Sequence, residues 1–301
     1  MATYNGAKYL SEQLDSILVQ TIPVDEIIIV DDCSTDHTWA ILSNYVARYA
    51  KIKIYRNELN MGVVKTFESA LTLCSGEFIA LSDQDDVWLP DKLEILLQNL
   101  KEDNDLVHSD AYLCDEALNV YALYSDTKGL HLNPNRFIDY LNINDVSGCT
   151  ALFTKSLLDK ILPIPNGFWM HDHYIAIMAR YYGNIIYVDK PLIKYRQHSS
   201  NSLGSKANLS YKKRKAWELN LADSLNLLKS LPEFKDNQDI AFASKYHMIQ
   251  YSGSIPDLST LVWCFKWFGL VQTLKLMFSF LGNSKILNKL FYKLRALFKG
   301  Q

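Results

Sequence analysis

The sequence predicts an α/β fold in which a mostly parallel central sheet is flanked by helices and followed by a C-terminal helical extension. Short apolar segments without polar alternation recur in the first hundred residues, as expected of strands buried on both faces. Segments with apolar residues at helical spacing separate them, and helical spacing alone continues beyond them. A Ser-, Asn- and Gly-rich stretch at residues 199–208 marks the boundary, so we expect an α/β domain over residues 1–204 and a helical extension over residues 205–301.

Strands and helices are expected to alternate along the first third of the chain. The continuous apolar strands are predicted at residues 26–30, 52–55, 78–81 and 106–108, with a later short strand at 191–195. The helices are predicted at residues 10–18, 39–49, 63–73 and 90–100, and in the extension at 211–231 and 234–251. Ligands of such sheets lie beyond the carboxyl ends of the strands, so polar residues at those ends are the candidates for function.

Composition narrows the class of protein. A net charge of −2 over 301 residues gives no reason to expect nucleic acid as a partner. The five cysteines are odd in number and scattered, which argues against a disulfide framework or a zinc site and for a reducing compartment. No signal-peptide pattern is visible, and Lys266 and Lys275 interrupt the most hydrophobic stretch before it reaches the length of a membrane span. We therefore expect a cytoplasmic protein.

The most informative segment is residues 78–88, where an apolar strand runs directly into three carboxylates and an aromatic residue. These are Asp83, Asp85, Asp86 and Trp88. Closely spaced carboxylates at the end of a buried strand repel one another and are costly to desolvate. A divalent cation, Mg²⁺ or Mn²⁺, removes that cost and takes its remaining ligands from water and phosphates. The segment therefore predicts a metal-diphosphate site, with a solvated aspartate-rich turn as the alternative.

Other strand ends and turns also carry polar residues. Asp31 and Asp32 follow a strand where a carboxylate could accept hydrogen bonds from a nucleobase or a ribose, and helix capping explains Asp36 but not this pair. The Thr-Tyr-Asn-Gly turn at residues 3–6 precedes a helix and suits a nucleotide, although Asn-Gly is also an ordinary turn. Lys65 could reach a diphosphate, although an exposed lysine on a helix is the more common case.

Two histidine-containing segments complete the candidates. Residues 168–174 place Asp172 between two histidines and beside aromatic residues, which favours a general base with a raised pKa. A helix cap is the alternative, and a zinc site lacks a further ligand nearby. Near residue 198, His198 could complete a metal site and Arg196 could pair with a phosphate, whereas a lone surface histidine more often has no such role.

The end of the chain is basic and aromatic. After Asp257 there is no acidic residue, and seven basic residues are interleaved with Trp and Phe, namely Lys266, Lys275, Lys285, Lys289, Lys293, Arg295 and Lys299. Such segments suit the surface of an anionic membrane, here the inner face of the cell membrane. Packing on the α/β domain or on another subunit is the alternative.

Taken in order, these segments resemble glycosyltransferase family 2, whose members have the Rossmann-like GT-A fold. The matching segments lie at residues 2–6, 29–36, 60–62, 82–88, 147–149, 171–172 and 195–198. The form Ser-Asp-Gln-Asp-Asp-Val-Trp most resembles the branch that contains bacterial rhamnosyltransferases of polysaccharide assembly. The resemblance implies an inverting, metal-dependent hexosyltransferase that moves a sugar from a dTDP- or UDP-sugar to a glycan or a lipid-linked acceptor.

The resemblance also implies roles for individual residues. Those expected to contact the nucleotide sugar are Thr3, Asn5, Asp31 and Asp83. Those expected to hold the divalent cation are Asp85 and His198. Asp172 is the expected general base that deprotonates the acceptor hydroxyl, with Gly148 and His171 on the acceptor side.

Two other functions remain open at this point. Family members carry an apolar strand before the Thr-Tyr-Asn-Gly turn, and only Met1 and Ala2 precede Thr3 here, so a catalytically impaired nucleotide-sugar-binding subunit is one alternative. A sugar nucleotidyltransferase is the other, although it would need a Gly-rich loop with Lys or Arg, which the turn at residues 3–6 matches poorly.

Overall fold

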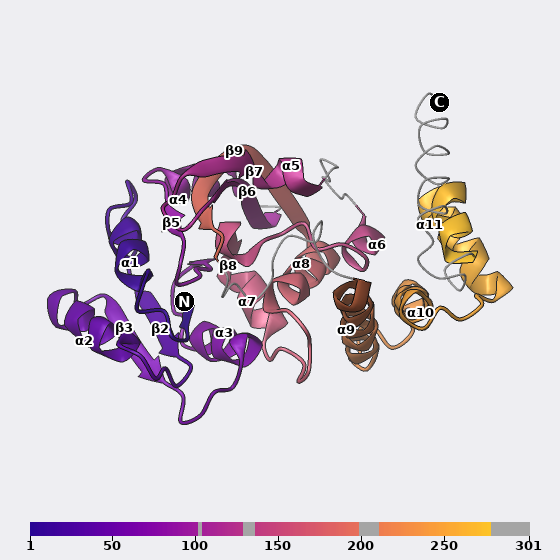
Figure 1. Cartoon of the computed structure of the whole chain (residues 1–301), viewed down its shortest axis with the longest axis horizontal. Coiled ribbons are helices and arrows are strands. Elements are labelled where there is room, and N and C mark those ends of the chain that lie inside the picture. The colour runs from indigo at the N-terminus through magenta and orange to yellow at the C-terminus, as the bar shows by residue number, and fades with distance from the viewer. Residues whose placement is uncertain (102–103, 129–135, 199–210, 278–301) are drawn as a thin grey trace. The chain divides into compact units, whose positions relative to one another are not determined.

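The computed structural model describes residues 1–101, 104–128, 136–198 and 211–277 (Figure 1). The chain divides into two compact units, Met1–Ala207 and Asn208–Gln301, and each is described by itself. The boundary stretch at residues 199–208 and the part of the basic tail beyond Met277 lie outside the described residues.

A three-stranded parallel sheet forms the first part of the α/β unit. Its strands β1 (Ala2–Thr3), β2 (Ile27–Asp31) and β3 (Ile52–Arg56) pair in that order. Helices α1 (Leu10–Leu18), α2 (Thr38–Arg48) and α3 (Val63–Thr72) connect and follow these strands. Every residue of β2 is buried, because alternate side chains serve two core clusters: Ile29 packs with Leu14 and Leu42, and Val30 packs with Ala70. The parallel order predicted from continuous apolar strands is therefore confirmed for this sheet.

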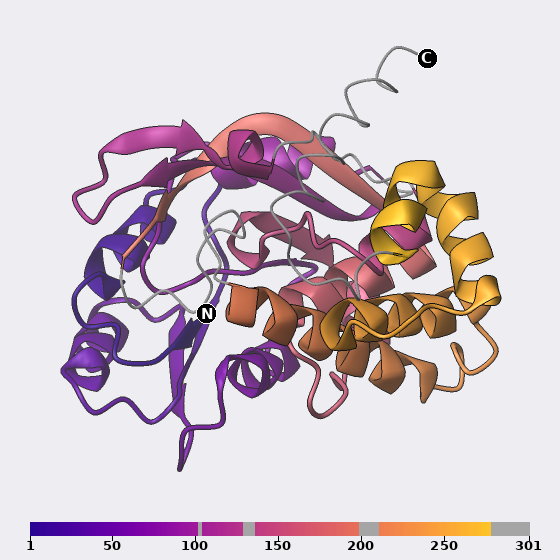
Figure 2. The ribbon, with the colours of Figure 1, turned by 45° about the vertical axis from the view of Figure 1, so that its right-hand side comes forward.

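The second sheet of the unit is mixed. Its order is β4-β8-β6-β9-β5, with β7 also paired to β6, and the strands are β4 (Phe78–Ala80), β5 (Val87–Trp88), β6 (Asn104–Cys114), β7 (Val120–Leu123), β8 (Ala151–Thr154) and β9 (Asn184–Arg196). Within this second sheet, the β6–β9 pairing of the described strands is parallel and the others are antiparallel. The two long strands run side by side over the length of the sheet (Figure 2).

The sequence identified only short parts of β6 and β9. Their polar and irregular character explains this, because β6 buries His108, Ser109 and Asp110 in succession and its pairing with β9 shifts register three times. The sequence of such a strand shows neither a continuous apolar run nor a regular alternation of apolar and polar residues. The α/β class is confirmed, and the sheet is less uniformly parallel than the sequence predicted.

Helices and one 3₁₀ turn pack around the second sheet and carry several of the predicted site residues. They are α4 (Lys92–Asn99), α5 (Tyr124–Lys128), α6 (Phe137–Tyr140), α7 (Lys155–Ile161), α8 (His171–Tyr182) and a 3₁₀ turn η1 (Gly148–Thr150). The helix α4 confirms the prediction made for residues 90–100. Helix α8 begins at His171, so Asp172 lies in its first turn.

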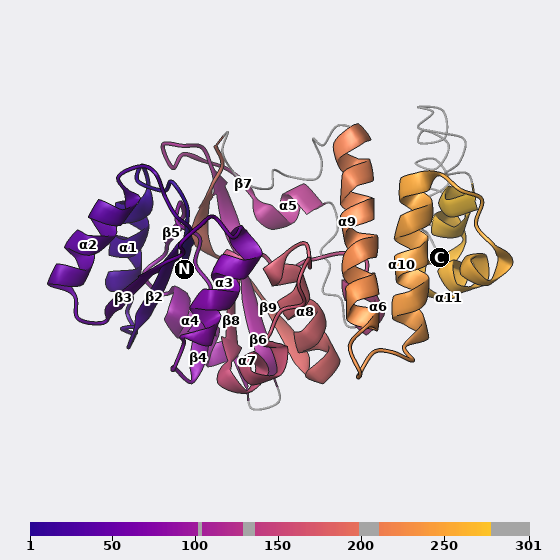
Figure 3. The same ribbon diagram turned by 90° about the horizontal axis from the view of Figure 1, so that it is seen from below.

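The second unit is helical, as predicted. It contains α9 (Tyr211–Lys229), α10 (Gln238–Ser252) and α11 (Leu258–Met277), and α11 bends at Gly269, where φ is 75° (Figure 3). Lys215 near the start of α9 donates to the carbonyls of Gln250 and Tyr251 at the end of α10, so these two helices run antiparallel. Among the described helices, none combines the length and apolar character that crossing a bilayer would need.

Candidate functional site

The turn at residues 3–6 and the aspartate loop at residues 83–86 are joined by one side chain. Gln84 accepts a hydrogen bond from the Tyr4 amide at 2.9 Å and donates to the Tyr4 carbonyl at 3.1 Å. A Cβ at Gly6 would lie 2.2 Å from the Gln84 side-chain oxygen, so a larger residue there would push the Gln84 side chain out of these hydrogen bonds. The two strand-end segments are therefore one assembled surface.

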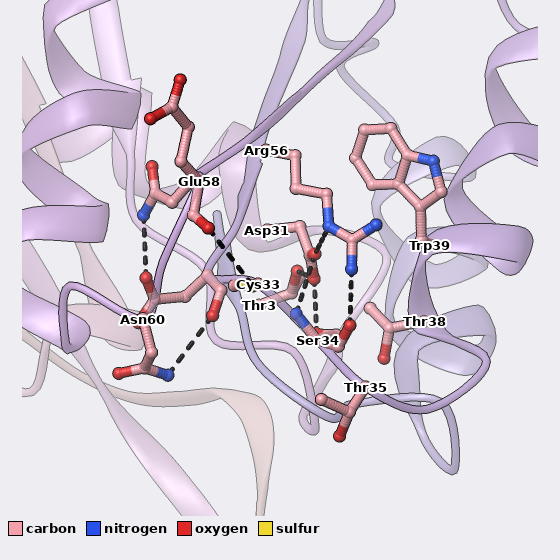
Figure 4. A network of polar contacts seen from close by, with 12 residues as sticks. Thr3, Asp31, Cys33, Ser34, Thr35, Thr38, Trp39, Arg56, Glu58 and Asn60 are labelled. Atoms are coloured by element: carbon pink, nitrogen blue, oxygen red, sulfur yellow. Dashed lines mark hydrogen bonds and ion pairs between the residues drawn. The ribbon is translucent and has the colours of Figure 1, made fainter.

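Asp31 is fully buried at the end of β2, and Figure 4 shows the donors around it. One carboxylate oxygen accepts hydrogen bonds from Thr3 Oγ1 at 3.2 Å and Ser34 Oγ at 2.5 Å. The other accepts from the Ser34 amide at 3.0 Å and forms an ion pair with Arg56 Nε at 3.2 Å. Two residues expected to contact the nucleotide, Thr3 and Asp31, thus lie together, and protein donors occupy both oxygens of the carboxylate.

Asn5 lies beside this group and also serves the loop. Its φ of 49° is a left-handed conformation that asparagine tolerates better than most residues. The Asn5 amide donates to Ser34 Oγ at 2.9 Å, and its side-chain oxygen accepts from the Thr35 amide at 2.8 Å. The predicted nucleotide residues are therefore brought together as one cross-linked surface.

Asp32 has a structural role that the sequence interpretation did not assign to it. One carboxylate oxygen accepts from Asn57 Nδ2 at 2.8 Å and from the Met61 amide at 2.7 Å, and the other accepts from the Gly62 amide at 2.9 Å. Ligand binding was expected for Asp31 and Asp32 as a pair. The structure instead commits Asp32 to holding the loop before α3.

Asp85 and His198 meet although 113 residues separate them. The Asp85 carboxylate and His198 Nε2 lie 2.8 Å apart, and both side chains are largely buried. Asp85 comes from the loop after β4, and His198 comes from the end of β9. A carboxylate and an imidazole are a donor set that suits a divalent cation such as Mn²⁺.

The Arg196 side chain holds the loop that carries Asp85. Its guanidinium is buried and donates to the Asp85 carbonyl at 2.8 Å, to the Glu116 carbonyl at 2.5 Å and to the Glu12 carboxylate at 2.5 Å. The sequence suggested that Arg196 could pair with a phosphate. The structure corrects this, because the guanidinium is committed to protein acceptors that anchor the aspartate loop.

A second group of possible metal donors lies deeper in the loop. Donor atoms of Asp83, Asp86 and Cys149 lie within 4.8 Å of one another. Burial, together with the charges of Asp86 and Asp83, holds the pKa of the Cys149 thiol well above its ordinary value, so a protonated thiol faces the two carboxylates. A hard cation fits such a set poorly, since only the thiolate is a good ligand. Asp85 and His198 are the better-fitting metal ligands.

Negative charge is crowded on this side of the site. Burial and the charges of Asp85 and Asp172 raise the pKa of Asp83 to about 7. Burial and the neighbouring carboxylates also raise the pKa of Asp86, whose Oδ2 has no hydrogen-bond partner among the described residues. A cation held at the neighbouring Asp85 and His198 would offset this crowding of negative charge.

Asp172 lies close to Gly148 and His171, the other predicted acceptor-side residues. A Cβ at Gly148 would lie 3.3 Å from both the Asp172 Cβ and His171 Nε2. The Asp172 carboxylate accepts from the His173 amide at 2.6 Å and lies in the first turn of α8. The N-cap position belongs to Met170, and Asp172 satisfies one free amide of the first turn, so the capping alternative stays open beside the general base.

The two histidines that flank Asp172 point to different surroundings. His171 stacks on Phe67 with ring centroids 3.9 Å apart, whereas His173 Nε2 contacts the Tyr140 carbonyl at 2.6 Å. Both His171 ring nitrogens lack partners among the described residues, and burial lowers the pKa of His171 to about 3. The pair does not form a zinc site with Asp172, which removes that alternative.

Lys65 contacts none of the site residues described above through a hydrogen bond or ion pair of the described residues. Its ammonium is 2.5 Å from the Glu68 carboxylate and 3.4 Å from the Ile164 carbonyl. The contact with a diphosphate expected for Lys65 stays a prediction.

Two residues that sequence reasoning missed matter more for the geometry, namely Gln84 and Lys92. Gln84 lies between two predicted site carboxylates, which is the signal that could have identified it.

Comparisons with known proteins identify the family of this chain. The family model described as glycosyl transferase family 2 matches residues 1–162. The chain is similar to the dTDP-rhamnosyl transferase RfbG of Shigella flexneri, with 32% identity over 70% of this chain and 75% of the relative. It is also similar to the putative teichuronic acid biosynthesis glycosyltransferase TuaG of Bacillus subtilis, with 39% identity over 33% of this chain and 40% of the relative.

A solved structure shows the same fold. The mannosyltransferase PcManGT of Pyrobaculum calidifontis, in complex with GDP-Man and Mn²⁺, has a TM-score of 0.56 at 18% identity. The match covers 100% of this chain and 86% of that chain. The GT-A fold expected from the sequence is confirmed.

Proposed function

Since the chain belongs to glycosyl transferase family 2, we propose that it is an inverting, divalent-metal-dependent glycosyltransferase of cell-surface polysaccharide biosynthesis. The sugar it moves is rhamnose, the donor is a dTDP- or UDP-sugar, and the acceptor is a hydroxyl of a glycan or a lipid-linked glycan. The similarity to a dTDP-rhamnosyl transferase supports rhamnose and dTDP. The similarity to a teichuronic acid biosynthesis enzyme supports polysaccharide assembly.

The observation that carries the proposal is the 2.8 Å contact between Asp85 and His198. It joins the two segments that the resemblance assigned to a metal. Asp83 links this pair to the acceptor side, because the charges of both Asp85 and Asp172 act on it. Metal ligands and a candidate general base thus surround one region, which is what transfer from a nucleotide-diphosphate sugar requires.

The chemistry of the proposal follows from the residues. Asp85 and His198 would hold the divalent cation, which when bound offsets the negative charge that develops on the departing diphosphate. The Asp172 carboxylate takes the proton of the acceptor hydroxyl while the hydroxyl oxygen bonds to the anomeric carbon of the donor sugar. The bond from that carbon to the diphosphate breaks on the opposite face, so the configuration inverts. Asn5 and Asp31 hold the loop against which the nucleotide lies.

Calorimetry and turnover with a panel of donors test this proposal. We expect dTDP-rhamnose or a UDP-sugar to bind in the presence of Mn²⁺ or Mg²⁺ and to be consumed, with faster release of the nucleotide when acceptor is present. Binding without turnover for every donor would favour the impaired subunit. Turnover of a nucleoside triphosphate with a sugar phosphate would favour the nucleotidyltransferase, which the family match argues against.

Peripheral contact with the inner face of the membrane is the second part of the proposal. Leu258, Val262 and Phe265 follow one another at helical spacing on α11 and are 76%, 60% and 57% exposed. Ile255, just before the helix, is 78% exposed. No acidic residue follows Asp257. An exposed apolar helix face followed by a basic sequence suits an anionic bilayer, which a lipid-linked acceptor would also occupy.

Flotation with vesicles of phosphatidylcholine and phosphatidylglycerol tests this part. The full chain is expected to float, and a variant with Leu258, Val262 and Phe265 changed to Ser is expected to remain in solution. A variant with Val120 and Tyr121 changed to Ser is the matched control, because these are exposed apolar residues of the α/β unit. Equal flotation of the triple variant and the native chain would refute the membrane contact.

A further inference from the structure

Lys92 is a lysine with no exposure to solvent, at the first position of α4. Its Nζ donates to the Cys149 carbonyl at 2.6 Å and lies 3.6 Å from the centre of the Trp88 ring. A buried amine is costly, and here burial lowers the pKa of Lys92 to about 7 although its neighbours Cys149, Asp86 and Asp83 act in the opposite direction. A side chain retained at such a cost calls for a reason beyond packing.

The hydrogen bond of Lys92 connects two parts of the site that are distant in sequence. The lysine follows the aspartate loop by only a few residues. The carbonyl that it holds belongs to the turn η1, whose Gly148 lies against Asp172, His171 and Leu81, all within 3.5 Å of where a Cβ would stand. The chain of contacts therefore runs from the aspartate loop through Lys92 and η1 to the candidate general base.

The close packing at Gly148 makes the position of the Asp172 side chain sensitive to small movements of η1. Because a Cβ at Gly148 would lie only 3.3 Å from Asp172 Cβ, little free space separates the two, and a small movement of η1 changes the space available to that carboxylate. The buried hydrogen bond from Lys92 to the Cys149 carbonyl ties η1 to the segment that follows the aspartate loop. A shift of about 1 Å between reacting groups can cost roughly 100-fold in rate.

We propose that Lys92 is a positioning residue that sets the separation between the aspartate loop and Asp172 by holding the Cys149 carbonyl. This inference rests on the proposed function of Asp172 as the general base. Among the described residues, no hydrogen bond or ion pair joins Lys92 to Thr3, Asn5 or Asp31 or to the pair Asp85 and His198. Its loss should therefore slow the transfer step while leaving nucleotide binding nearly unchanged.

Lys92→Met tests the proposal, because it keeps the length and apolar stem of the side chain and removes the donor. We expect turnover of dTDP-rhamnose, or of whichever donor the native chain consumes, to fall roughly 10- to 100-fold. The Kd for dTDP or UDP with Mn²⁺ should stay within about threefold. Lys92→Gln, which retains a shorter donor, should recover part of the rate.

Lys155→Met is the matched control. Lys155 also meets a cysteine carbonyl, that of Cys74 at 3.5 Å, but it is partly exposed and also pairs with Asp159. It should leave turnover unchanged. Hydrogen exchange gives a readout that needs no activity: backbone amides of residues 148–152 should exchange faster in Lys92→Met than in the native chain or in Lys155→Met.

The outcomes separate this inference from the proposed function. Turnover of Lys92→Met within twofold of the native chain, with unchanged exchange at residues 148–152, would overturn the inference. A parallel loss of nucleotide affinity, thermal stability and turnover would also overturn it, because Lys92 would then serve the fold alone. If the native chain consumes no donor at all, the proposed function fails, and the exchange experiment still decides whether Lys92 holds η1.

Discussion

Two walls of the candidate site differ in how their polar groups are satisfied. The nucleotide wall consists of residues 3–6, 31–36 and 56–62, and the metal-acceptor wall consists of residues 83–86, 147–149 and 171–172. On the nucleotide wall, both oxygens of Asp31 and of Asp32 accept hydrogen bonds or ion pairs. On the metal-acceptor wall, Asp86 Oδ2 and both ring nitrogens of His171 lack partners among the described residues.

The difference indicates which wall carries the chemistry. A buried polar group without a partner is destabilising, and proteins keep such groups mainly where a ligand, an ion or a reaction uses them. The nucleotide wall is complete without a ligand, since Arg56 offsets the charge of Asp31. The metal-acceptor wall instead gathers charge, and burial with the charges of Asp85 and Asp172 raises the pKa of Asp83 to about 7. We therefore propose that the metal-acceptor wall carries the reaction and that the nucleotide wall mainly shapes the site.

Removing the candidate base should give the largest effect. Asp172→Asn keeps the shape of the side chain and removes the group that accepts the proton. We expect turnover to fall by about 1,000-fold or more, because a positioned general base contributes roughly 100- to 10,000-fold. Steady-state release of nucleotide from the donor measures this loss.

The same variant tests whether the two walls act separately in nucleotide binding and in transfer. Its Kd for dTDP or UDP with Mn²⁺, measured by calorimetry, should match that of the native chain, because Asp172 lies on the metal-acceptor wall. Near-native turnover would remove Asp172 from the mechanism and make His171 and Gly148 ordinary packing residues.

Changing the metal pair should give the next largest effect. Asp85→Asn removes charge from the contact between Asp85 and His198 and is expected to raise the Kd for Mn²⁺ about 10- to 100-fold, with a matching loss of turnover at low metal. High Mn²⁺ should restore part of the rate. EDTA should abolish turnover in the native chain.

Asp86→Asn is the comparison for that experiment. It alters the deeper group of Asp83, Asp86 and Cys149 and leaves Asp85 and His198 in place. If Asp86→Asn weakens Mn²⁺ binding more than Asp85→Asn does, the metal belongs to the deeper group and our assignment is wrong.

The nucleotide wall and the first sheet were the parts that the sequence predicted well. Continuous runs such as residues 27–30 can be buried on both faces only in a covered sheet, and the polar residues at the strand ends then meet by geometry. The convergence of Asp83, Asp85 and Asp172 was predicted through the resemblance, and the structure brings these residues together. Their chemical roles stay predictions.

The parts that the sequence could not predict depend on contacts between distant segments. Whether Arg196 meets a phosphate or the Asp85 carbonyl depends on where β9 ends relative to the aspartate loop, and no local pattern reports that. A lysine in the motif Pro-Asp-Lys is ordinarily exposed, so the burial of Lys92 is invisible without the fold. Asp32 looked equivalent to Asp31, and only the path of residues 57–62 distinguishes them.

On the nucleotide wall, substitutions should reduce stability. Asp31→Ala leaves the Ser34 amide and the Arg56 guanidinium without their buried partner, and we expect a loss of about 3 kcal/mol in the free energy of unfolding. Urea denaturation measures the loss. Asp172→Asn is the control, since it should change stability by less than about 1 kcal/mol. Equal losses in the two variants would mean that the walls do not differ in the way we infer.

On the metal-acceptor wall, one substitution should instead increase stability. His171 stacks on Phe67, and its ring nitrogens have no partner among the described residues, so His171→Phe keeps the stacking and removes two unsatisfied atoms. Burial lowers the pKa of His171 to about 3, whereas a histidine in the unfolded chain titrates near 6.5. Below pH 6.5 the unfolded native chain therefore gains a proton that the folded chain does not, and the native chain loses stability as pH falls toward 3.

The variant lacks this proton uptake, so its advantage should grow as the pH falls. We expect His171→Phe to be more stable than the native chain by about 2 kcal/mol at pH 5.0 and by less at pH 7.5, in urea denaturation at both values. Comparing the two chains at each pH cancels the titration of the other groups. A variant that is less stable at both values would show that the His171 ring nitrogens are satisfied in solution. That result would remove the main evidence that this wall retains polar groups at a cost to stability.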